Sequence, residues 1–277
     1  MLENKRVVIA GAGHAGIEAA LAVTRAGGKA LLVTMDKSAI GRLSCNPAIG
    51  GLAKSHLVHE IDALGGIMGV AADANALQYK TLNKTKGRAV WSTRVQIDKK
   101  KYPKYIQGLI SKNKNIDIVS GEVVSFTTRS ERVVSVTTKK GDLIKCGAFV
   151  ITCGTFLNGL IHIGNKNFKA GRMGEKRSSG LTEYLVKQGF ETGRLKTGTP
   201  PRVSRKSIDF TKVLVAPGEK NFTPFSIFSK KRTFIQEDCF IVNTNKKVHE
   251  QIFKNINSSA MFSGKIKAIG PRYCPSI

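Results

Sequence analysis

Ten residues near the N-terminus combine an apolar strand with a glycine-rich turn, and their spacing suits the binding of a dinucleotide. The run 7–10 leads directly into three glycines spaced as G-x-G-x-x-G. In this pattern the first glycine makes a tight turn, the second lets phosphates approach, and the third lets helix and strand pack closely. Backbone N–H groups at the start of the next helix then face the pyrophosphate. We therefore predict a dinucleotide site made of Gly11, Ala12, Gly13, His14, Ala15 and Gly16.

The elements around this turn follow the order of a βαβ unit. A helix is predicted over 17–26, with Ile17, Ala20, Leu21 and Thr24 on one face, and two glycines end it. Residues 29–33 then form a second buried strand. A glycine turn without a ligand remains the alternative, but the ordered set of strand, motif, helix and strand favours a binding site.

Two cysteines lie in settings where a thiol can be activated for nucleophilic chemistry. Cys45 lies in a glycine-rich loop that precedes a predicted helix, and a helix N-terminus lowers the pKa of a nearby thiol. Cys274 follows an arginine by two residues and precedes a proline. At each position a small buried side chain is the alternative interpretation.

The other three cysteines, Cys146, Cys153 and Cys239, lie in strand-like runs and are predicted to be core residues. The chain contains no C-x-x-C pair, and its five histidines lack zinc-ligand spacing, so no metal site is predicted. The first strand begins within ten residues of the start, which leaves no room for a signal peptide, and no apolar run approaches the length of a membrane span. These features predict free thiols in a reducing cytoplasm.

The net charge is +26, from 45 basic and 19 acidic residues. A strongly basic surface suits a polyanionic partner such as a nucleic acid, while compositional bias is the alternative. Short basic clusters occur at 99–101, 139–140 and 230–232. The loop 194–202 adds Arg194, Lys196 and Arg202 beside threonines and a glycine, a combination that suits phosphate or carboxylate groups. A solvated loop is the other interpretation of this segment.

Further elements follow from periodicity. An amphipathic helix is expected over 52–64 with Ala53, Leu57, Ile61 and Leu64 on its apolar face, and another helix from the capping Asp98 to residue 110. Residues 73–97 could be strand or helix. Later segments of period two predict strands over 116–119, 123–128, 133–138, 143–146, 148–155 and 240–244, a turn at 139–142, and a last helix over 248–256.

A βαβ start, a small antiparallel meander and a return strand ending in T-C-G give the order of the glutathione-reductase-like FAD fold. We therefore predict an α/β protein with an incomplete FAD-binding Rossmann-like domain over 1–160. An inserted α+β region on the substrate and NADH side is predicted over 161–277. The chain stops in G-P-R-Y-C-P-S-I without a polar tail, so we expect it to be truncated at the C-terminus.

Four blocks of sequence resemble the MnmG (GidA) family of tRNA-modifying flavoenzymes. They include S-C-N-P-A-I-G-G and E-I-D-A-L-G-G within 41–66, G-T-F-L-N-G with I-H-I-G within 154–164, G-R-L-K-T-G-T-P-P-R at 193–202, and G-P-R-Y-C-P-S-I at 270–277. The blocks occur in family order over the whole chain, which covers about the first half of the family's length. Thr34 with Asp36 at the end of the second strand fits the family, whereas Arg88 and the pair Trp91-Ser92 depart from its usual residues.

The resemblance implies an enzyme that binds FAD and NADH and works with the GTPase MnmE. Such an enzyme adds a carboxymethylaminomethyl or aminomethyl group at C5 of the tRNA wobble uridine, with the methylene carbon taken from methylene-tetrahydrofolate. It also implies a homodimer in the full-length family. The region that docks MnmE is expected to be missing from this chain.

By position, the resemblance also implies roles for individual residues. The turn Gly11–Gly16 would hold the FAD pyrophosphate, Val123 would meet the adenine through its backbone, and Ser178 would add a hydroxyl contact. Cys45 and Cys274 match two functionally important cysteines, one of which would attack C6 of the uracil. The pyridine nucleotide would meet Gly270, Pro271, Arg272 and Tyr273, and tRNA or cofactor phosphates would meet Arg194, Lys196 and Arg202.

Two other functions stay open on the sequence. One is a folate- and FAD-dependent methyltransferase for uridine 54 of tRNA, which has the same fold. The other is an inactive fragment that only binds RNA through its positive charge.

Overall fold

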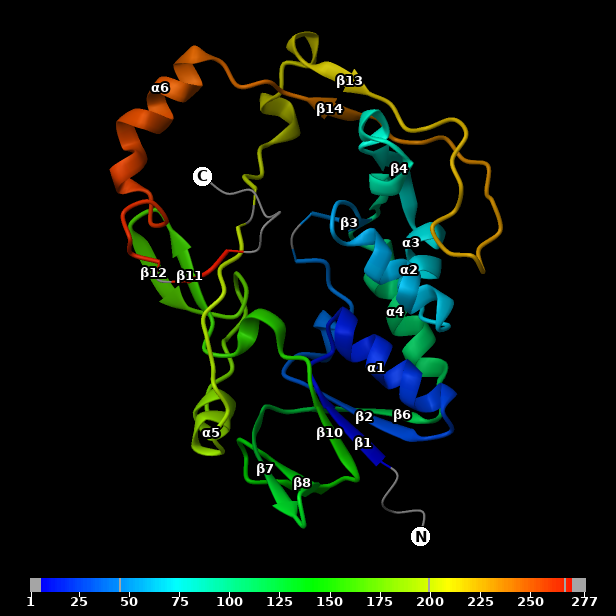
Figure 1. The fold of residues 1–277 in the computed structure, drawn as a ribbon, viewed down its shortest axis with the longest axis vertical. Helices are drawn as coiled ribbons and strands as arrows, with labels where there is room; N and C mark the ends of the chain where they lie inside the picture. The colour runs from blue at the N-terminus through cyan, green and yellow to red at the C-terminus, as the bar shows by residue number, and fades with distance from the viewer. Residues whose placement is uncertain (1–5, 45, 199, 267, 271–277) are drawn as a thin grey trace.

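The computed structural model describes residues 6–44, 46–198, 200–266 and 268–270, and its centre is a parallel sheet (Figure 1). The sheet contains β1 (Arg6–Ala10), β2 (Lys29–Thr34), β6 (Ile116–Ser120) and β10 (Ala148–Ile151) in the order β10-β1-β2-β6. All three pairings are parallel. Helix α1 (His14–Arg25) joins β1 to β2, and β10 returns beside β1 as predicted. The predicted α/β class with a parallel sheet is confirmed.

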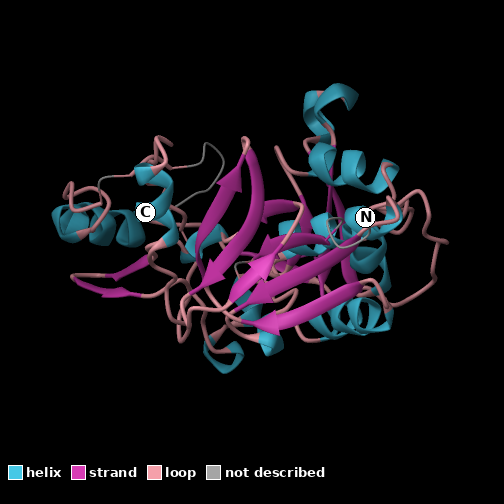
Figure 2. Cartoon of the chain, turned by 90° about the horizontal axis from the view of Figure 1, so that it is seen from below, coloured by secondary structure: helices cyan, strands magenta, loops and turns pink. Residues whose placement is uncertain are grey.

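Both faces of this sheet are covered, which explains why its strands are continuous apolar runs. Ile9 and Leu32 face a core shared with α1 and with Tyr102 and Ile106 of α4 (Lys101–Lys112). On the other face, Val8 and its neighbours pack against a meander. The meander consists of β7 (Val123–Arg129), β8 (Arg132–Thr138) and β9 (Leu143–Lys145), and Figure 1 shows β7 and β8 beside β10 and β1. Figure 2 shows most strands of the chain gathered between helices.

One predicted strand belongs to a different sheet from the one its periodicity indicated. Residues 116–119 were grouped with the meander because the period of two begins there, but β6 pairs in parallel with β2. The reason is the preceding helix α4, which makes β2–α4–β6 a crossover unit; such units place their second strand parallel to the first. The turn 139–142 does join two meander strands, with Gly141 at φ +94°.

The ambiguous segment 73–97 forms mostly strands. A second, antiparallel sheet has the order β3-β5-β4 and consists of β3 (Ala48–Gly50), β4 (Ala76–Leu82) and β5 (Ser92–Ile97). Helices α2 (Ser55–Ala63) and α3 (Met68–Ala74) pack beside it. Asp98 accepts backbone hydrogen bonds from Lys100 and Lys101, so it starts α4 as expected, although the helix itself begins at Lys101.

The predicted buried face of α2 is wrong. Leu57 and Leu64 are 52% and 79% exposed, and the helix instead buries Ser55, Val58 and Asp62. Ser55 donates to the carbonyl of Thr93 at 2.6 Å, and a carboxylate oxygen of Asp62 accepts from the backbone N–H of Ile227 at 2.9 Å. Because these partners come from distant segments, the apolar period of the helix alone could not indicate them.

The second half of the chain has short elements and few buried side chains. Its apolar residues that are buried, within the described part of 161–270, are Ala170, Leu181 and Phe225. The strand predicted over 240–244 and the helix predicted over 248–256 are present with shifted ends. The helices and strands from residue 160 onward are β11 (Leu160–Ile163), β12 (Lys166–Lys169), α5 (Leu181–Lys187), β13 (Leu214–Ala216), β14 (Cys239–Ile241) and α6 (Lys246–Asn255).

Single turns of 3₁₀ helix complete the fold at Lys37–Ala39, Lys84–Lys86, Arg88–Val90, Gly154–Phe156, Arg205–Ser207, Phe210–Lys212 and Ile256–Ser258. The segment 217–237 between β13 and β14 runs back along β4, α2 and α3 (Figure 1). The predicted division into a domain over 1–160 and a second region over 161–277 stays a prediction. Within the described ranges, the chain has no helix long and apolar enough to cross a membrane.

Candidate functional site

The glycine turn has the geometry that its sequence predicted. Gly11 has φ +105°, and a Cβ there would lie 2.5 Å from the backbone oxygen of Thr152. A Cβ at Gly16 would lie 1.9 Å from the oxygen of Gly11, whereas one at Gly13 would meet nothing within 4 Å. The first and third glycines are therefore required by close packing, and the second faces open space.

The hydroxyl of Thr152, which follows the neighbouring strand β10, binds the backbone of the glycine turn. It donates to the carbonyls of Ala10 and Gly11 at 2.9 and 3.0 Å, just beyond the end of β10. The turn therefore lies between β1 and β10, where the strand order of the sheet reverses. Ligands of open α/β sheets bind at this position.

The N-terminus of α1 is suited to an anion. Gly13 caps the helix without a side-chain hydrogen bond, and the first turn contains no acidic residue. Its backbone N–H groups are thus not covered by a capping side chain, and the helix dipole favours negative charge at this end. The turn fits a dinucleotide pyrophosphate on these grounds.

His14 occupies the turn as a half-buried ring. It makes an edge contact with Tyr102 at a centroid distance of 5.7 Å. Burial lowers the pKa of His14, and the positive charge of Arg172 lowers it further. The imidazole is therefore neutral at pH 7, and its role in the turn is packing rather than charge.

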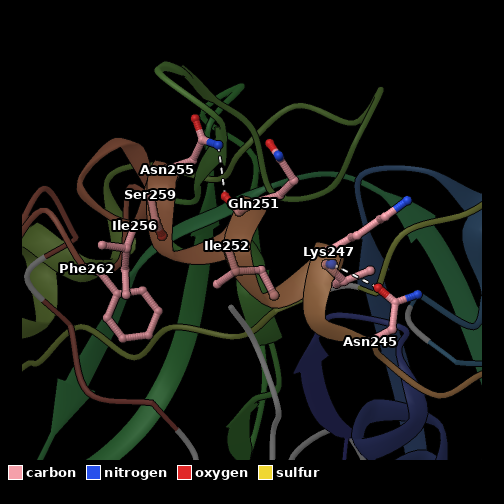
Figure 3. Close-up of a pocket in the computed structure, with 9 residues that line it drawn as sticks. Asn245, Lys247, Gln251, Ile252, Asn255, Ile256, Ser259 and Phe262 are labelled. Carbon is pink, nitrogen blue, oxygen red and sulfur yellow. Dashed lines mark hydrogen bonds between the residues drawn. The ribbon is translucent and has the colours of Figure 1, made fainter.

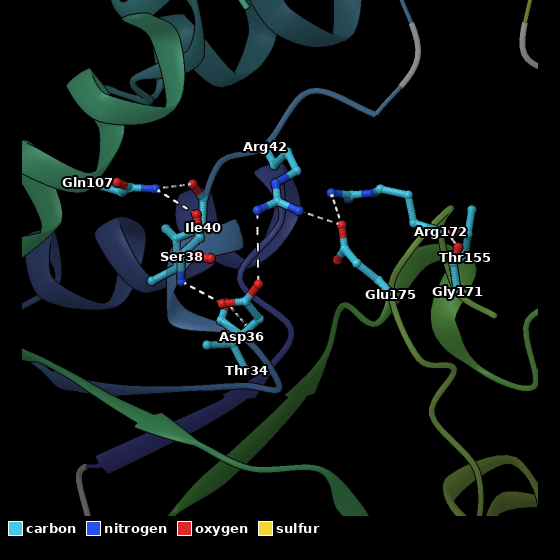
Figure 4. A network of polar contacts seen from close by, with 10 residues as sticks. All are labelled: Thr34, Asp36, Ser38, Ile40, Arg42, Gln107, Thr155, Gly171, Arg172 and Glu175. Carbon is cyan, nitrogen blue, oxygen red and sulfur yellow. Dashed lines mark hydrogen bonds and ion pairs between the residues drawn. The ribbon is translucent and has the colours of Figure 1, made fainter. Parts of the chain in front are cut away.

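A polar network links the end of β2 to a segment of the second half of the chain (Figure 4). Arg42 contacts Glu175 at 2.7 Å and Asp36 at 3.9 Å, and Arg172 contacts the same Glu175 at 3.2 Å. Hydrogen bonds from Ser38, together with the charge of Arg42, hold the pKa of Asp36 below its usual range. Sequence reasoning missed Arg42, Arg172 and Glu175, because a pair separated by 133 residues leaves no local signal.

Val123 and Ser178 are brought toward the same edge of the sheet. They are 4% and 5% exposed. The backbone N–H of Gly121 donates to Thr34 at 2.9 Å, and that of Ser179 donates to Glu122 at 2.7 Å. These bonds join the start of β7 both to the end of β2 and to the segment before α5. The adenine and hydroxyl contacts of Val123 and Ser178 stay predictions.

The loop that contains Cys45 begins beside the glycine turn. Gly41 donates its backbone N–H to the carbonyl of Ala12 at 3.2 Å. Cys45 itself lies outside the described residues, as do Pro271, Arg272, Tyr273 and Cys274. Their predicted roles remain predictions.

The other cysteines divide between core and edge. Cys146 is 3% exposed and belongs to the core under the meander, which confirms its prediction. Cys153 and Cys239 are half-buried. Burial raises the pKa of Cys153 to about 11, so this thiol is protonated at neutral pH.

The basic loop 194–202 lies against the segment that ends at Gly270. Lys196 donates its backbone N–H to Ile269 at 2.9 Å, and Ile269 donates to Arg194 at 3.2 Å. The Arg194 guanidinium donates to the carbonyls of Leu157 and Asn158. Arg194 thus links its loop to residues 157–158, while Arg202 is exposed in the same loop. The structure thus places the basic loop beside residues 268–270, and the predicted contacts with tRNA and the pyridine nucleotide stay predictions.

A separate groove of about 580 Å³ lies along α6 (Figure 3). Its side chains are mainly apolar or amide-bearing, with Lys247 as the charged one. Without a carboxylate, thiol or imidazole in its lining, the groove offers no acid–base pair. It lies at the other end of the molecule from the central sheet (Figure 1).

Comparison with known proteins gives a consistent result. Residues 6–277 match the family described as glucose inhibited division protein A. Two similar curated proteins carry the name tRNA uridine 5-carboxymethylaminomethyl modification enzyme MnmG. The one from Thermodesulfovibrio yellowstonii is 48% identical over 98% of this chain and 43% of its own length. That from Chlorobium phaeovibrioides is 46% identical over 98% of this chain and 44% of its own length.

Solved structures agree. Aquifex aeolicus GidA in its form I crystal has a TM-score of 0.90 and 45% identity, over 99% of this chain and 47% of that protein. A GidA-related protein from Thermus thermophilus, with a TM-score of 0.51 and 20% identity, shares the fold. The chain spans less than half the length of the curated relatives it matches. Since the match extends from residue 6 to residue 277, the chain belongs to the glucose inhibited division protein A (GidA, MnmG) family.

Proposed function

We propose that this chain is the dinucleotide-binding part of a flavin-dependent enzyme that modifies the wobble uridine of tRNA. The observation that carries the proposal is the glycine turn, whose first and third glycines leave no space for a Cβ and whose second is open. The curated relatives are named as tRNA uridine modification enzymes, which supports the choice of substrate. Because the chain spans about 44% of those relatives, the complete activity is part of the proposal.

The residues of the turn, Gly11–Gly16, would hold the pyrophosphate of FAD at the N-terminus of α1. Val123 would contact the adenine through its backbone and Ser178 would add a hydroxyl. Arg172 lies close enough to His14 to lower its pKa, so its charge reaches the same helix end. When bound, FAD supplies two-electron transfer.

One of the two thiols, of Cys45 or of Cys274, is the proposed nucleophile. A thiolate that adds to C6 of the uracil forms a carbon–sulfur bond and turns C5 into a nucleophile, which can attack the one-carbon unit of methylene-tetrahydrofolate. The bond from Gly41 to Ala12 supports a role for Cys45, since its loop starts at the glycine turn. NADH is the proposed reductant, held by the segment that begins at Gly270.

The partners follow from the same proposal. They are tRNA, the GTPase MnmE and a second copy of the full-length protein, in the cytoplasm. The division into a Rossmann-like domain over 1–160 and a substrate-side region over 161–277 belongs to the proposal too.

Nucleoside analysis of tRNA from cells that lack this chain tests the function. We expect the carboxymethylaminomethyl and aminomethyl groups to disappear from the wobble uridine and to return when the wild-type gene is restored. A Cys274→Ser gene should fail to restore them, whereas a Cys239→Ser gene, altered on the edge strand β14, should succeed. Loss of the methyl group at uridine 54 with an intact wobble position would instead support the methyltransferase.

A further inference from the structure

We propose that a basic and aromatic surface far from the glycine turn is an RNA-binding face, with Trp91 as a stacking platform for one unpaired base. The face consists of the hairpin tip, residues 80–91 at the end of β4 and in the loop to β5, and the strap, residues 217–238 between β13 and β14. It rests on the proposed function in one respect, which is that the RNA is tRNA.

Hairpin tip and strap form one continuous surface. Lys84 contacts the Glu219 carboxylate at 3.1 Å, and Thr81 donates its backbone N–H to the same carboxylate at 2.7 Å. Lys80 donates to the carbonyl of Pro217 at 3.1 Å. Figure 1 shows the strap descending alongside β4. Two segments more than 120 residues apart in sequence therefore present a single face.

This face carries more positive charge per residue than the chain as a whole. The two segments contain eight basic and three acidic residues, a net charge of +5 over 34 residues against +26 over 277. One of these acids, Glu219, is already held by Lys84 and Thr81. Within the described ranges, Lys86, Arg88, Lys220 and Lys231 form no ion pair with a carboxylate, and all four are exposed. Their charge is available to a polyanion.

The aromatic rings of the face are held with their positions fixed. Trp91 is 44% exposed, its indole N–H donates to the carbonyl of Lys84 at 3.3 Å, and the Arg88 guanidinium lies 5.7 Å from its ring centroid. Because the Trp91 ring is already held in place, little conformational entropy is lost when a base stacks on it.

On the strap, a hollow of about 380 Å³ is lined by Phe222 together with Lys220, Lys231 and Arg232. Phe222 stacks on Tyr79 at a centroid distance of 4.1 Å, and Lys231 lies 5.5 Å from the Phe222 ring. Asp238 is the acidic residue among those that line this hollow. Cations that alternate with ring faces are the combination by which proteins bind single-stranded RNA: the cations meet phosphates and the rings meet bases.

Trp91 is the one tryptophan of the sequence, so its fluorescence reports directly on the proposed contact. We would titrate the chain with an unmodified tRNA transcript and follow both the emission and the binding isotherm at several salt concentrations. Stacking should quench the emission, and Trp91→Ala should weaken binding about tenfold. Trp91→Phe, which keeps a ring, should recover most of the affinity. Lys220→Ala with Lys231→Ala should make the dependence of log affinity on log salt less steep by about 1.5.

The matched control removes the same charge elsewhere. Lys145 on β9 and Lys187 on α5 are exposed. Strand β9 pairs with β8, and Figure 1 shows β8 and α5 at the opposite end of the molecule from β4. The double alanine variant of these lysines should therefore bind tRNA with nearly wild-type affinity. The inference is overturned if both double variants lose affinity equally, or if tRNA binds without quenching Trp91. It is also overturned if heparin quenches Trp91 as strongly as tRNA does. FAD binding, measured on the same variants, should not change; loss of FAD binding by the wild-type chain would count against the proposed function instead.

Discussion

The glycine turn and the RNA-binding face differ in the groups that they offer to a ligand, which are backbone groups in the turn and side chains in the face. The turn is built from backbone: it lies over a core of fully buried strands, and two of its glycines leave no room for a Cβ. The face is built from exposed side chains of the hairpin tip and of the strap, and the strap belongs to the half of the chain that buries few apolar residues within its described part. A backbone site depends on packing, whereas a side-chain site depends on charge and ring placement, so the two should respond to different substitutions.

The largest effect is expected at Gly16. A Cβ there would lie 1.9 Å from the oxygen of Gly11 and 2.8 Å from the Thr152 hydroxyl, so Gly16→Ala must displace the turn from the helix end. We expect FAD affinity to fall by about 100-fold or more, because backbone N–H groups that shift by an ångström no longer meet the phosphates. Titration of both proteins with FAD measures the change. Tight FAD binding by Gly16→Ala would show that the turn is not the phosphate site.

The next largest effect is a loss of stability on replacement of Asp73, the buried carboxylate that binds the strap. Asp73 is 6% exposed and accepts hydrogen bonds from the Tyr79 hydroxyl and from the backbone N–H groups of Phe225 and Ser226, at 2.6 to 2.9 Å. Asp73→Ala leaves three buried donors without partners, which should lower the free energy of unfolding by about 3 kcal/mol. Urea unfolding gives the value.

The control for this change is Asp209→Ala, which removes an exposed carboxylate that accepts from Thr211. It should lower the free energy of unfolding much less than Asp73→Ala does, because the carboxylate of Asp209 is exposed to water. If Asp73→Ala is equally mild, the strap is not held by its buried carboxylate. In that event the RNA-binding face would lack the fixed geometry that we assign to it.

A smaller effect is predicted for the thiol beside the turn. Burial raises the pKa of Cys153 to about 11, so its thiolate forms only as the pH rises through that value. At pH 8 its alkylation should be about tenfold slower than that of an ordinary thiol, after allowance for the greater nucleophilicity of a more basic thiolate. Mass spectrometry of alkylated peptides over a pH series measures this. Labelling that is half-maximal near pH 8.5 would contradict the burial of this thiol.

The smallest effect is expected at Gly108, an exposed glycine of α4 whose Cβ would meet nothing within 4 Å. Gly108→Ala should raise the free energy of unfolding by about 0.5 to 1 kcal/mol, because alanine favours the helix, and should leave FAD binding unchanged. Thermal unfolding with and without FAD measures both. A loss of FAD affinity here would mean that glycine substitutions act on the fold as a whole and not on the turn.

The local parts of the fold could be predicted from the sequence, since each depends on neighbouring residues. The strand, glycine turn, helix and second strand at 6–34 follow from apolar periodicity and from glycines at positions with positive φ or close contacts. The start of α4 follows from Asp98, whose carboxylate accepts two backbone hydrogen bonds.

The features that could not be predicted from the sequence depend on contacts between residues far apart in the chain. The buried face of α2 includes two polar residues, of which Asp62 bonds to Ile227, 165 residues away. The network of Arg42, Glu175 and Arg172 likewise joins segments that no local pattern connects. At the site, the sequence predicted which residues form the turn, but not that Thr152 closes it from the neighbouring strand.

The central claim is that the glycine turn binds a dinucleotide through its pyrophosphate, and a comparison of FAD with flavin mononucleotide tests it most directly. The two ligands share the flavin ring, but flavin mononucleotide lacks both the pyrophosphate and the adenosine. The account predicts that the folded wild-type chain binds FAD saturably and binds flavin mononucleotide at least about 100-fold more weakly. Equal affinity for the two ligands, or no binding of either by the folded chain, would contradict it.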